Sequence, residues 1–378
     1  MLEYIGFDSV KNLKDILENN NFKKIFLITG RKSFEQMEIK SIILDTLSEV
    51  QFYQFNDFTP NPKIHDIKKG LNLFKKMNFD AIIAVGGGSV LDMGKAISIF
   101  SSNEGDPVKI IKKEIEITKK GIPLIRIPTT AGSGSEATHF AVVYIGKTKY
   151  SLADQEFLKP EYIIVDPQFT LKLPKKISAC SGMDALSQAI ESHWNVNSTD
   201  ESKIYSKKAI ELTMSNLVKV VNDPDKESRK NMAIAANYAG KAINITKTTA
   251  CHAISYPITS HFNVPHGHAV ALTLPSMIIF NSEVEEKDCQ DSRGVLFVKN
   301  ALKDLISFMK ASNFEEAKDI ILTLMHDIGL ETNLHSLGIK SQEDIEIIIK
   351  NGFTPNRVKN NPRMLTESNL RHILGEIR

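Results

Sequence analysis

The sequence predicts an α/β domain with a parallel sheet, followed by an all-α domain. In roughly the first 170 residues, short β-rich runs alternate with segments whose apolar residues recur three and four positions apart, a pattern typical of parallel strands joined by helices. From about Ser181 the β-rich runs become scarce, and long segments rich in Ala, Leu, Ile, Lys and Glu follow. We therefore expect domains at 1–180 and 181–378, with the boundary between Pro174 and Gly182.

The individual elements follow from the same two patterns, the short β-rich runs and the helical spacing of apolar residues. Strands are expected at Lys24–Thr29, Gln51–Phe55, Ala81–Val85, Leu124–Ile127 and Tyr162–Val165. Helices are expected in the first domain at Phe34–Val50 and Ile64–Asn78. In the second domain, helices are expected at Asp184–Trp194, Ser202–Asn222, Arg229–Ile245, Val295–Ala311, Phe314–Ile328 and Ser341–Lys350.

Composition excludes several classes of protein. The 47 basic and 45 acidic residues are interspersed and give a net charge of +2, so neither nucleic acid nor a membrane surface is an expected partner. No apolar run approaches the ~20 residues of a membrane span, and the N-terminus lacks the pattern of a signal peptide. Cys180, Cys251 and Cys289 have no paired spacing, which argues against disulfides and for a cytoplasmic location.

Two glycine-rich turns follow predicted strands. Gly86, Gly87, Gly88 and Ser89 stand between a strand and a helix, where close backbone approach and unpaired N–H groups suit a dinucleotide pyrophosphate. The stretch 128–138 adds hydroxyls for phosphate or ribose from Thr129, Thr130 and Ser133. Ligands of open α/β sheets bind beyond the carboxyl ends of strands, which predicts a dinucleotide-binding domain. The alternative for each is a tight strand-to-helix turn.

A third turn bears on the choice of nucleotide. Gly30, Arg31, Lys32 and Ser33 follow the first predicted strand, and basic side chains there accommodate the 2'-phosphate of NADP. A solvated loop is the alternative, so NADP(H) or NAD(H) both remain open.

The second domain holds a candidate metal site. Asp184, Gln188 and Glu191 share one helix face, whereas His193 lies about 180° from Asp184 and is expected to be structural. Four of the ten histidines lie between residues 250 and 270. Imidazole is the commonest metal ligand, so this concentration indicates metal binding or proton transfer.

Helical geometry separates these four histidines. His252 and Tyr256 are four apart and share a helix face, on a helix that Pro257 is expected to limit. Pro265 is expected to open the next helix as its first residue. His266 and His268 diverge by about 200°, so only one can face a given site. We choose His266 and expect His268 and His261 to be structural or supporting.

Four motifs stand in order along the chain. They are Gly-Gly-Gly-Ser-x-x-Asp-x-x-Lys at 86–95, Thr-Thr-Ala-Gly-Ser-Gly-Ser-Glu at 129–136, Gly-Met-Asp-Ala-Leu at 182–186 and Pro-His-Gly at 265–267. Together they resemble the iron-containing (group III) alcohol dehydrogenase family. The resemblance implies a nicotinamide-dependent homodimer with a divalent metal, Fe²⁺ before Zn²⁺ or Mn²⁺, in the cleft between the domains.

Carried over by position, the resemblance assigns individual residues. The implied metal ligands are Asp184, Gln188, His252 and His266, where Gln188 replaces the usual histidine and is a weaker donor. Tyr256 stands where many relatives have a histidine near the nicotinamide, and it is the expected proton relay. Asp92 and Lys149 are implied on the cofactor side.

A narrower resemblance suggests a substrate. The run 241–262 and the segments around Gln188 and His139 are similar to phosphonoacetaldehyde reductases. Lys247 and His139 are then candidates to bind the phosphonate. The expected reaction is reduction of phosphonoacetaldehyde to 2-hydroxyethylphosphonate. The alternatives are a generic short-chain alcohol dehydrogenase, a glycerol-1-phosphate dehydrogenase-like or dehydroquinate synthase-like enzyme, and a degenerate nucleotide-binding paralogue.

Overall fold

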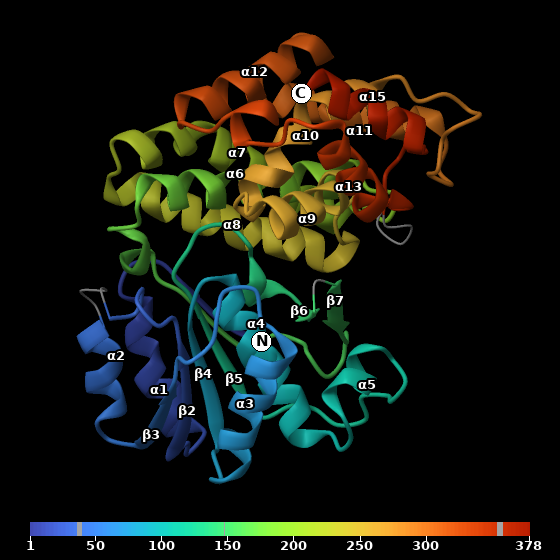
Figure 1. The fold of residues 1–378 in the computed structure, drawn as a ribbon. Helices are drawn as coiled ribbons and strands as arrows, with labels where there is room; N and C mark the ends of the chain where they lie inside the picture. Colours follow the sequence, from blue (N-terminus) through green and yellow to red (C-terminus); the bar gives the residue numbers. More distant parts are fainter. Residues whose placement is uncertain (36–39, 147, 354–357) are drawn as a thin grey trace. The chain divides into compact units, whose positions relative to one another are not determined.

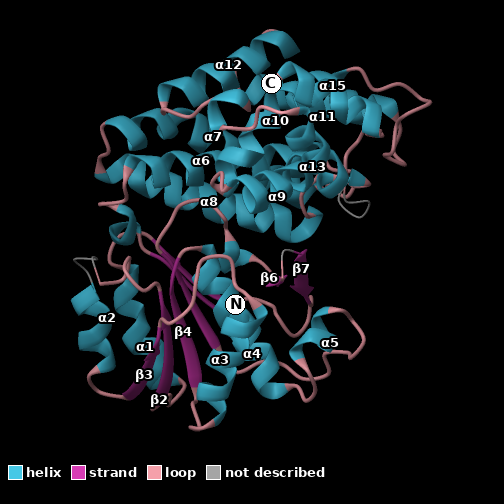
Figure 2. Ribbon diagram, viewed as in Figure 1, coloured by secondary structure: helices cyan, strands magenta, loops and turns pink. Residues whose placement is uncertain are grey.

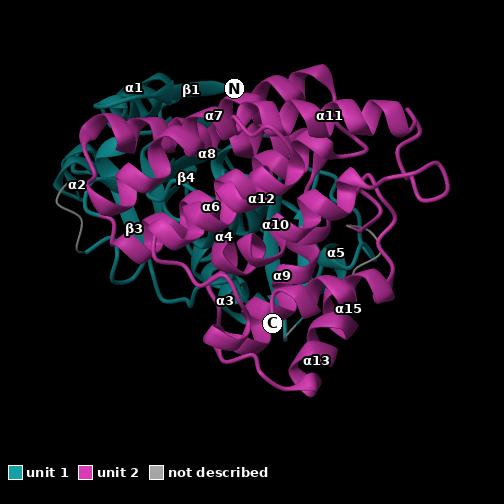
Figure 3. Ribbon diagram, turned by 90° about the horizontal axis from the view of Figure 1, so that it is seen from above, with its two compact units in different colours: residues 1–172 teal, residues 173–378 magenta. Residues whose placement is uncertain are grey.

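The computed structural model describes residues 1–35, 40–146, 148–353 and 358–378. The chain divides into two compact units, residues 1–172 and 173–378 (Figure 3). The division lies just before helix α6 (Lys175–Trp194), so the boundary expected near residue 180 falls inside that helix. The helix with Asp184 starts earlier than expected because Ala179, Cys180 and Met183 continue its buried face.

Unit 1 is built around a six-stranded sheet with the order β1-β8-β5-β4-β2-β3. Figure 2 shows strands of this sheet in magenta, with β2, β3 and β4 labelled. All of its strand pairs are parallel, which confirms the predicted fold class. The central strands are almost wholly buried, as parallel strands covered on both faces must be. The strands are β1 (Leu2–Ile5), β2 (Lys24–Thr29), β3 (Gln51–Phe55), β4 (Ala81–Gly86), β5 (Leu124–Pro128) and β8 (Tyr162–Val165).

Helices cover both faces of this sheet (Figure 1). Helices α3 (Ile64–Lys75) and α4 (Gly88–Ser102) pack with Phe26 and Phe55 into one apolar cluster. Helices α1 (Asn12–Asn19) and α2 (Lys40–Leu47) pack into a second cluster on the opposite face, with Ile25, Ile83 and Ile127. The expected helix at Phe34–Val50 is described only from Lys40, because residues 36–39 lie outside the described part.

Three strands were not predicted. The edge strand β1 is only four residues long, and its exposed ends give no clear alternation. The other two, β6 (Phe140–Ile145) and β7 (Thr148–Ala153), form a separate antiparallel hairpin. A short helix, α5 (Pro107–Ile111), precedes β5. The hairpin was missed because it lies outside the repeating strand–helix pattern.

The described part of unit 2 is made of helices. Besides α6 they are α7 (Asp200–Asn222), α8 (Lys226–Thr246), α9 (Ala250–Phe262), α10 (His266–Ser282), α11 (Val295–Phe308), α12 (Phe314–Asp327), α13 (Gln342–Gly352) and α15 (Glu367–Glu376). Helix α6 packs against α7, α8 and α10, and almost every residue from Ser178 to Trp194 is buried. No described helix combines the length and apolar character needed to cross a bilayer.

Two expectations about proline were wrong. Helix α9 continues through Pro257 to Phe262, because buried Ala253, Ile254 and Ile258 hold the helix in place despite the lost backbone hydrogen bond. Pro265 is the N-cap of α10, one position before the first helical residue, His266.

Candidate functional site

Three neighbouring strands of unit 1 end at the predicted cofactor turns. Strand β4 pairs with both β2 and β5, and the register aligns Thr29 with Val85 and Gly86 with Pro128. The turns that follow, 30–33, 86–89 and 129–133, therefore lie at the same edge of the sheet. The Thr129 N–H donates to the Gly86 carbonyl over 3.0 Å. Parallel pairing thus brings together three segments that are distant in sequence.

The glycine-rich turns at 86–89 and 129–133 lie against each other. A Cβ on Gly88 would stand 2.7 Å from Ser133 Oγ and 3.1 Å from Ser133 Cβ, so the Ser133 side chain would have to move to accept it. Gly87 is the N-cap of α4 and supplies no side-chain cap. The Val90 N–H donates to the Gly87 carbonyl (2.9 Å), and the N-terminus of a helix favours an anion. Arg31 and Lys32 are exposed after β2, where a cationic side chain could meet a nucleotide phosphate.

Asp92 and Lys95 of the same motif hold the surrounding segments together. The Asp92 carboxylate accepts hydrogen bonds from Ser135 Oγ (2.6 Å) and the Val142 N–H (2.9 Å). The fully buried Lys95 donates to Ser135, Thr138 and the Phe140 carbonyl. Burial lowers the pKa of Lys95 to about 7, against the opposing effect of Asp92. Asp92 and Lys95 therefore fix the 133–142 segment against α4.

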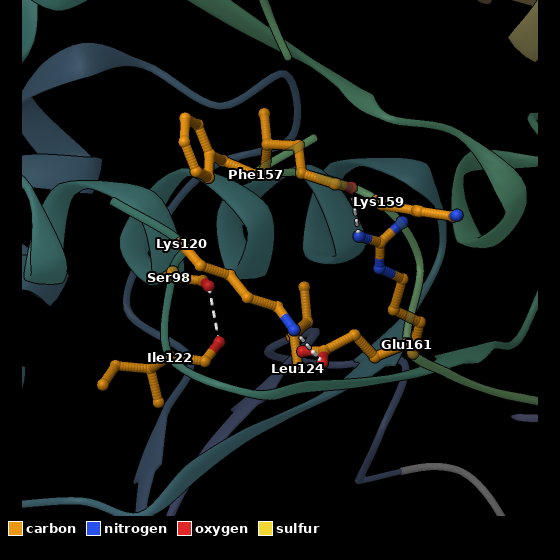
Figure 4. A pocket seen from close by; sticks show the side chains of 10 residues that line it. Ser98, Lys120, Ile122, Leu124, Phe157, Lys159 and Glu161 are labelled. Atoms are coloured by element: carbon orange, nitrogen blue, oxygen red, sulfur yellow. Dashed lines mark hydrogen bonds and ion pairs between the residues drawn. The ribbon is translucent and has the colours of Figure 1, made fainter. Parts of the chain in front are cut away.

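A small hollow of unit 1 lies elsewhere, near the amino ends of β5 and β8 (Figure 4). Lys120 and Glu161 form an ion pair across it, and Lys159 stands beside them. Arg126 donates to the carbonyls of Thr138 (2.7 Å) and Leu158 (2.9 Å). Because parallel sheets bind nucleotides at the carboxyl ends of strands, this hollow is not the expected cofactor site.

Three side chains of unit 2 converge as metal ligands would. Asp184 on α6, His252 on α9 and His266 at the start of α10 offer ligand atoms that all lie within 4.8 Å of one another. Asp184 Oδ1 is 3.4 Å from His252 Nε2 and 4.0 Å from His266 Nε2. Ligand atoms about 2.1 Å from a tetrahedral ion lie roughly 3.4 Å apart, so the spacing fits a first-row transition metal.

Gly267 explains how α10 comes so close to α6. A Cβ on Gly267 would lie 1.9 Å from the Cys180 carbonyl oxygen and 2.9 Å from Asp184 Cβ. Only glycine allows this backbone contact, which places His266 beside Asp184. The Pro-His-Gly sequence therefore combines a helix start, a ligand and a close-approach residue.

Glu191 is a member of this cluster that sequence reasoning placed on the Asp184 face without giving it a role. It lies on the Asp184 face of α6, fully buried, and hydrogen bonds to His252 Nδ1. Burial opposes the charged forms of both groups, but their mutual attraction lowers the pKa of Glu191 and raises that of His252. Asp184 behaves similarly: burial would raise its pKa, and His252 and His266 hold it below the usual range. The signal was its spacing, seven residues after Asp184.

Unsatisfied buried atoms mark the centre of the cluster. Asp184 Oδ1, Gln188 Oε1 and His252 Nε2 are buried and have no hydrogen-bond partner among the described residues. Native proteins seldom leave such atoms unpaired, so their convergence fits an ion. The Tyr256 ring stacks on His266, with centroids 5.9 Å apart. The residue types and the geometry both fit a divalent metal.

Other histidines that the sequence singled out have contacts of their own. His268 is buried and its Nε2 contacts the Glu331 carbonyl oxygen (2.7 Å), while His261 is exposed. His193 is buried against Ser206 and Phe308. His139 is a buried residue of unit 1.

The remaining predicted residues belong to different units. Lys149 is half-buried on β7 of unit 1, and Lys247 is an exposed residue of unit 2 that follows α8. Lys247 has φ 64° and ψ −171°, a conformation that normally favours glycine. Its carbonyl accepts from Thr246 Oγ1 (2.7 Å) and Asn195 Nδ2 (3.3 Å), which stabilises this conformation.

Comparison with known proteins agrees with this geometry. Residues 3–167 match the model for "Iron-containing alcohol dehydrogenase", and residues 178–377 match the C-terminal model of the same family. An aldehyde-alcohol dehydrogenase 2 of Entamoeba histolytica is 30% identical over 87% of this chain, which spans only 37% of that relative's length. A phosphonoacetaldehyde reductase of Streptomyces viridochromogenes is 29% identical to this chain. The match covers 79% of this chain and 76% of the length of that relative.

A solved structure extends the comparison to the full chain. The sulfoacetaldehyde reductase from Bifidobacterium kashiwanohense, in complex with NAD+, has a TM-score of 0.88 and 28% identity. The match covers 100% of this chain and 96% of that protein.

Proposed function

The chain belongs to the iron-containing alcohol dehydrogenase family, and on that premise we propose that it is a metal-dependent NAD(P)H aldehyde reductase. One observation carries the proposal: the ligand atoms of Asp184, His252 and His266 converge, and two of the three residues leave a buried atom without a hydrogen-bond partner among the described residues. Gln188 Oε1 is the fourth proposed ligand.

Each group of residues has a distinct part in the proposed reaction. When bound, the ion supplies Lewis acidity at the aldehyde oxygen and the reduced nicotinamide supplies a hydride. Gly86–Ser89 hold the pyrophosphate at the N-terminus of α4, with Thr129, Thr130 and Ser133 lining the cofactor. Arg31 and Lys32 favour NADPH. The Tyr256 phenol, beside His266, passes a proton to the product oxygen.

The proposed substrate is phosphonoacetaldehyde. Two of the similar proteins are named for two-carbon aldehydes that carry an acidic group, a phosphonate in one and a sulfonate in the other. Lys247 supports the same substrate class here, because its ammonium is exposed and its main chain is held in a strained conformation. Strain of this kind is maintained only where surrounding contacts fix it, and it clusters at ligand sites. His139 is the second proposed contact to the phosphonate.

The test is a substrate and cofactor panel with a matched variant. Phosphonoacetaldehyde, acetaldehyde and propanal are each assayed with NADPH and NADH on the metal-loaded protein and on Lys247→Gln. We expect kcat/KM to be highest for phosphonoacetaldehyde with NADPH, and Lys247→Gln to raise KM about tenfold for that aldehyde alone. Equal kcat/KM values across the panel would instead support a generic short-chain alcohol dehydrogenase.

Two further properties belong to this proposal. We expect a homodimer, which size-exclusion chromatography with light scattering would detect, and a cytoplasmic location. The odd number of unpaired cysteines supports a reducing compartment.

A further inference from the structure

Glu191 is a fully buried carboxylate with three donors directed at it. It lies on α6 two turns after Asp184, at the same helix face. Oε1 accepts hydrogen bonds from Thr249 Oγ1 (2.8 Å) and the His252 N–H (3.2 Å). Oε2 bonds to His252 Nδ1. These three hydrogen bonds come from His252 and from the residue three positions before it.

These contacts decide how His252 presents its ring. When Nδ1 carries the proton and donates it to Glu191, Nε2 keeps its lone pair. That Nε2 atom is 3.4 Å from Asp184 Oδ1 and has no hydrogen-bond partner among the residues that the structure describes. We propose that Glu191 is the positioning residue of the metal site, fixing the tautomer and orientation of His252 and strengthening it as a ligand. The inference rests on the proposed function, since it requires that the site binds a divalent ion.

Charge gives a second reason for a carboxylate here. A divalent ion brings two positive charges into a site where His252, His266 and Gln188 are all neutral ligands. Asp184 supplies one negative charge, and an ionised Glu191 supplies the other. The buried assembly is then neutral, which avoids the large cost of an uncompensated charge away from water.

Gln188 makes this support more important. An amide oxygen is a weaker donor to a first-row metal than imidazole, so His252 and His266 must supply more of the binding energy. The chain also fixes Glu191 itself: Trp194 Nε1 donates to Thr249 Oγ1 (3.1 Å), which in turn donates to Glu191. These hydrogen bonds hold the carboxylate rigid behind His252.

The experiment measures metal binding without relying on turnover. Cobalt(II) is titrated into metal-free wild type, Glu191→Gln and Ser192→Ala, with a competing chelator and visible absorption as the readout. Ser192 is the matched control, because it is the next residue of α6, is fully buried, and contacts Thr246 rather than the cluster. We expect Glu191→Gln to weaken cobalt binding by 10- to 100-fold and Ser192→Ala to leave it within about twofold of wild type.

A spectroscopic signature separates positioning from general stability. Bound cobalt shifts the His252 Nδ1–H proton far from the normal NMR range, and this exchangeable signal should be present in wild type and shifted or lost in Glu191→Gln. If Glu191→Gln does not fold, Thr249→Val removes one donor to Glu191 and should weaken cobalt binding about threefold. Unchanged affinity and an unchanged proton signal in the folded variant would overturn the inference. Wild type that binds no cobalt would overturn the proposed function itself, which is a distinguishable result.

Discussion

The cofactor turns of unit 1 and the histidine cluster of unit 2 are built in opposite ways. The turns use backbone groups and small residues that follow three neighbouring parallel strands, and they pack so closely that a Cβ on Gly88 would meet the Ser133 side chain. The cluster uses side chains from α6, α9 and α10, held by buried hydrogen bonds. The first region should therefore be sensitive to added atoms, and the second to the loss of single donor atoms.

The largest expected effect is in the cluster. His252→Ala removes a ligand and leaves Glu191 buried beside an empty space, so we expect loss of bound metal and a fall in kcat/KM of at least about 1,000-fold. Metal content of the purified protein and steady-state kinetics measure the two effects. His261→Ala is the control, since this exposed histidine is on the same helix and should change neither. Stoichiometric metal with full activity in His252→Ala would remove the basis of the proposed site.

A smaller effect is expected at the turns. Gly88→Ala places a Cβ 2.7 Å from Ser133 Oγ, and the turns must separate slightly to accept it. We expect the dissociation constant for the nicotinamide nucleotide to rise about tenfold, with metal content unchanged. Binding is measured by titration of NADPH fluorescence. Gly375→Ala, where the added atom has nothing within 4 Å, should bind nucleotide normally. If Gly88→Ala instead loses metal and keeps nucleotide affinity, the division of roles between the two regions is wrong.

The same contrast explains what the sequence could predict. Strands β2, β3 and β8 were predicted with their observed bounds, because short apolar runs with flanking turn residues are local signals. The turn at 30–33 follows β2, and the glycine-rich turns follow β4 and β5, each predicted to end one residue before its observed end. Asp184, His252 and His266 were grouped through a family resemblance combined with helix-face geometry, since no local pattern shows which helices pack together.

Other features depended on tertiary contacts. The role of Glu191 depends on α9 packing against α6, and the continuation of α9 past Pro257 depends on burial of its flanking residues. Neither contact leaves a periodicity in the sequence. Lys247 was selected by resemblance, and only the structure shows its unusual backbone conformation.

Exchange of a single donor sharpens the comparison further. Gln188→His replaces a buried amide by imidazole at the position of the fourth proposed ligand, and we expect cobalt or zinc affinity to increase by about three- to tenfold. The nucleotide dissociation constant should not change, because the turns do not use this side chain. Competitive chelation and nucleotide titration on the same sample test both parts. Weaker metal binding in the variant would show that the pocket around Gln188 is shaped for an amide.

A further expected effect, on stability alone, separates two buried histidines of unit 2. His252 has Glu191 beside it, whereas burial lowers the pKa of His193 to about 3, with a smaller effect from Lys203. Asp304 is 3.7 Å from His193 Nε2 but half exposed, and does not offset the burial. Because the folded pKa lies below the usual 6.5, the unfolded chain binds more protons between pH 3 and 6.5. The stability that His193 contributes is fully present above pH 6.5 and is lost as the pH falls.

Replacing this histidine removes the titration. Between pH 6.5 and 5, the free energy of unfolding of His193→Asn should therefore fall by about 1 to 2 kcal/mol less than that of wild type. Each unit of pKa difference is worth about 1.4 kcal/mol. Urea unfolding of the metal-free proteins across this range measures the difference, because all other groups titrate equally in both. Parallel pH profiles would mean that His193 binds a proton as readily in the folded protein as in the unfolded chain. In that case Asp304 would act for His193 as Glu191 does for His252, and burial alone would not distinguish a structural histidine from a ligand.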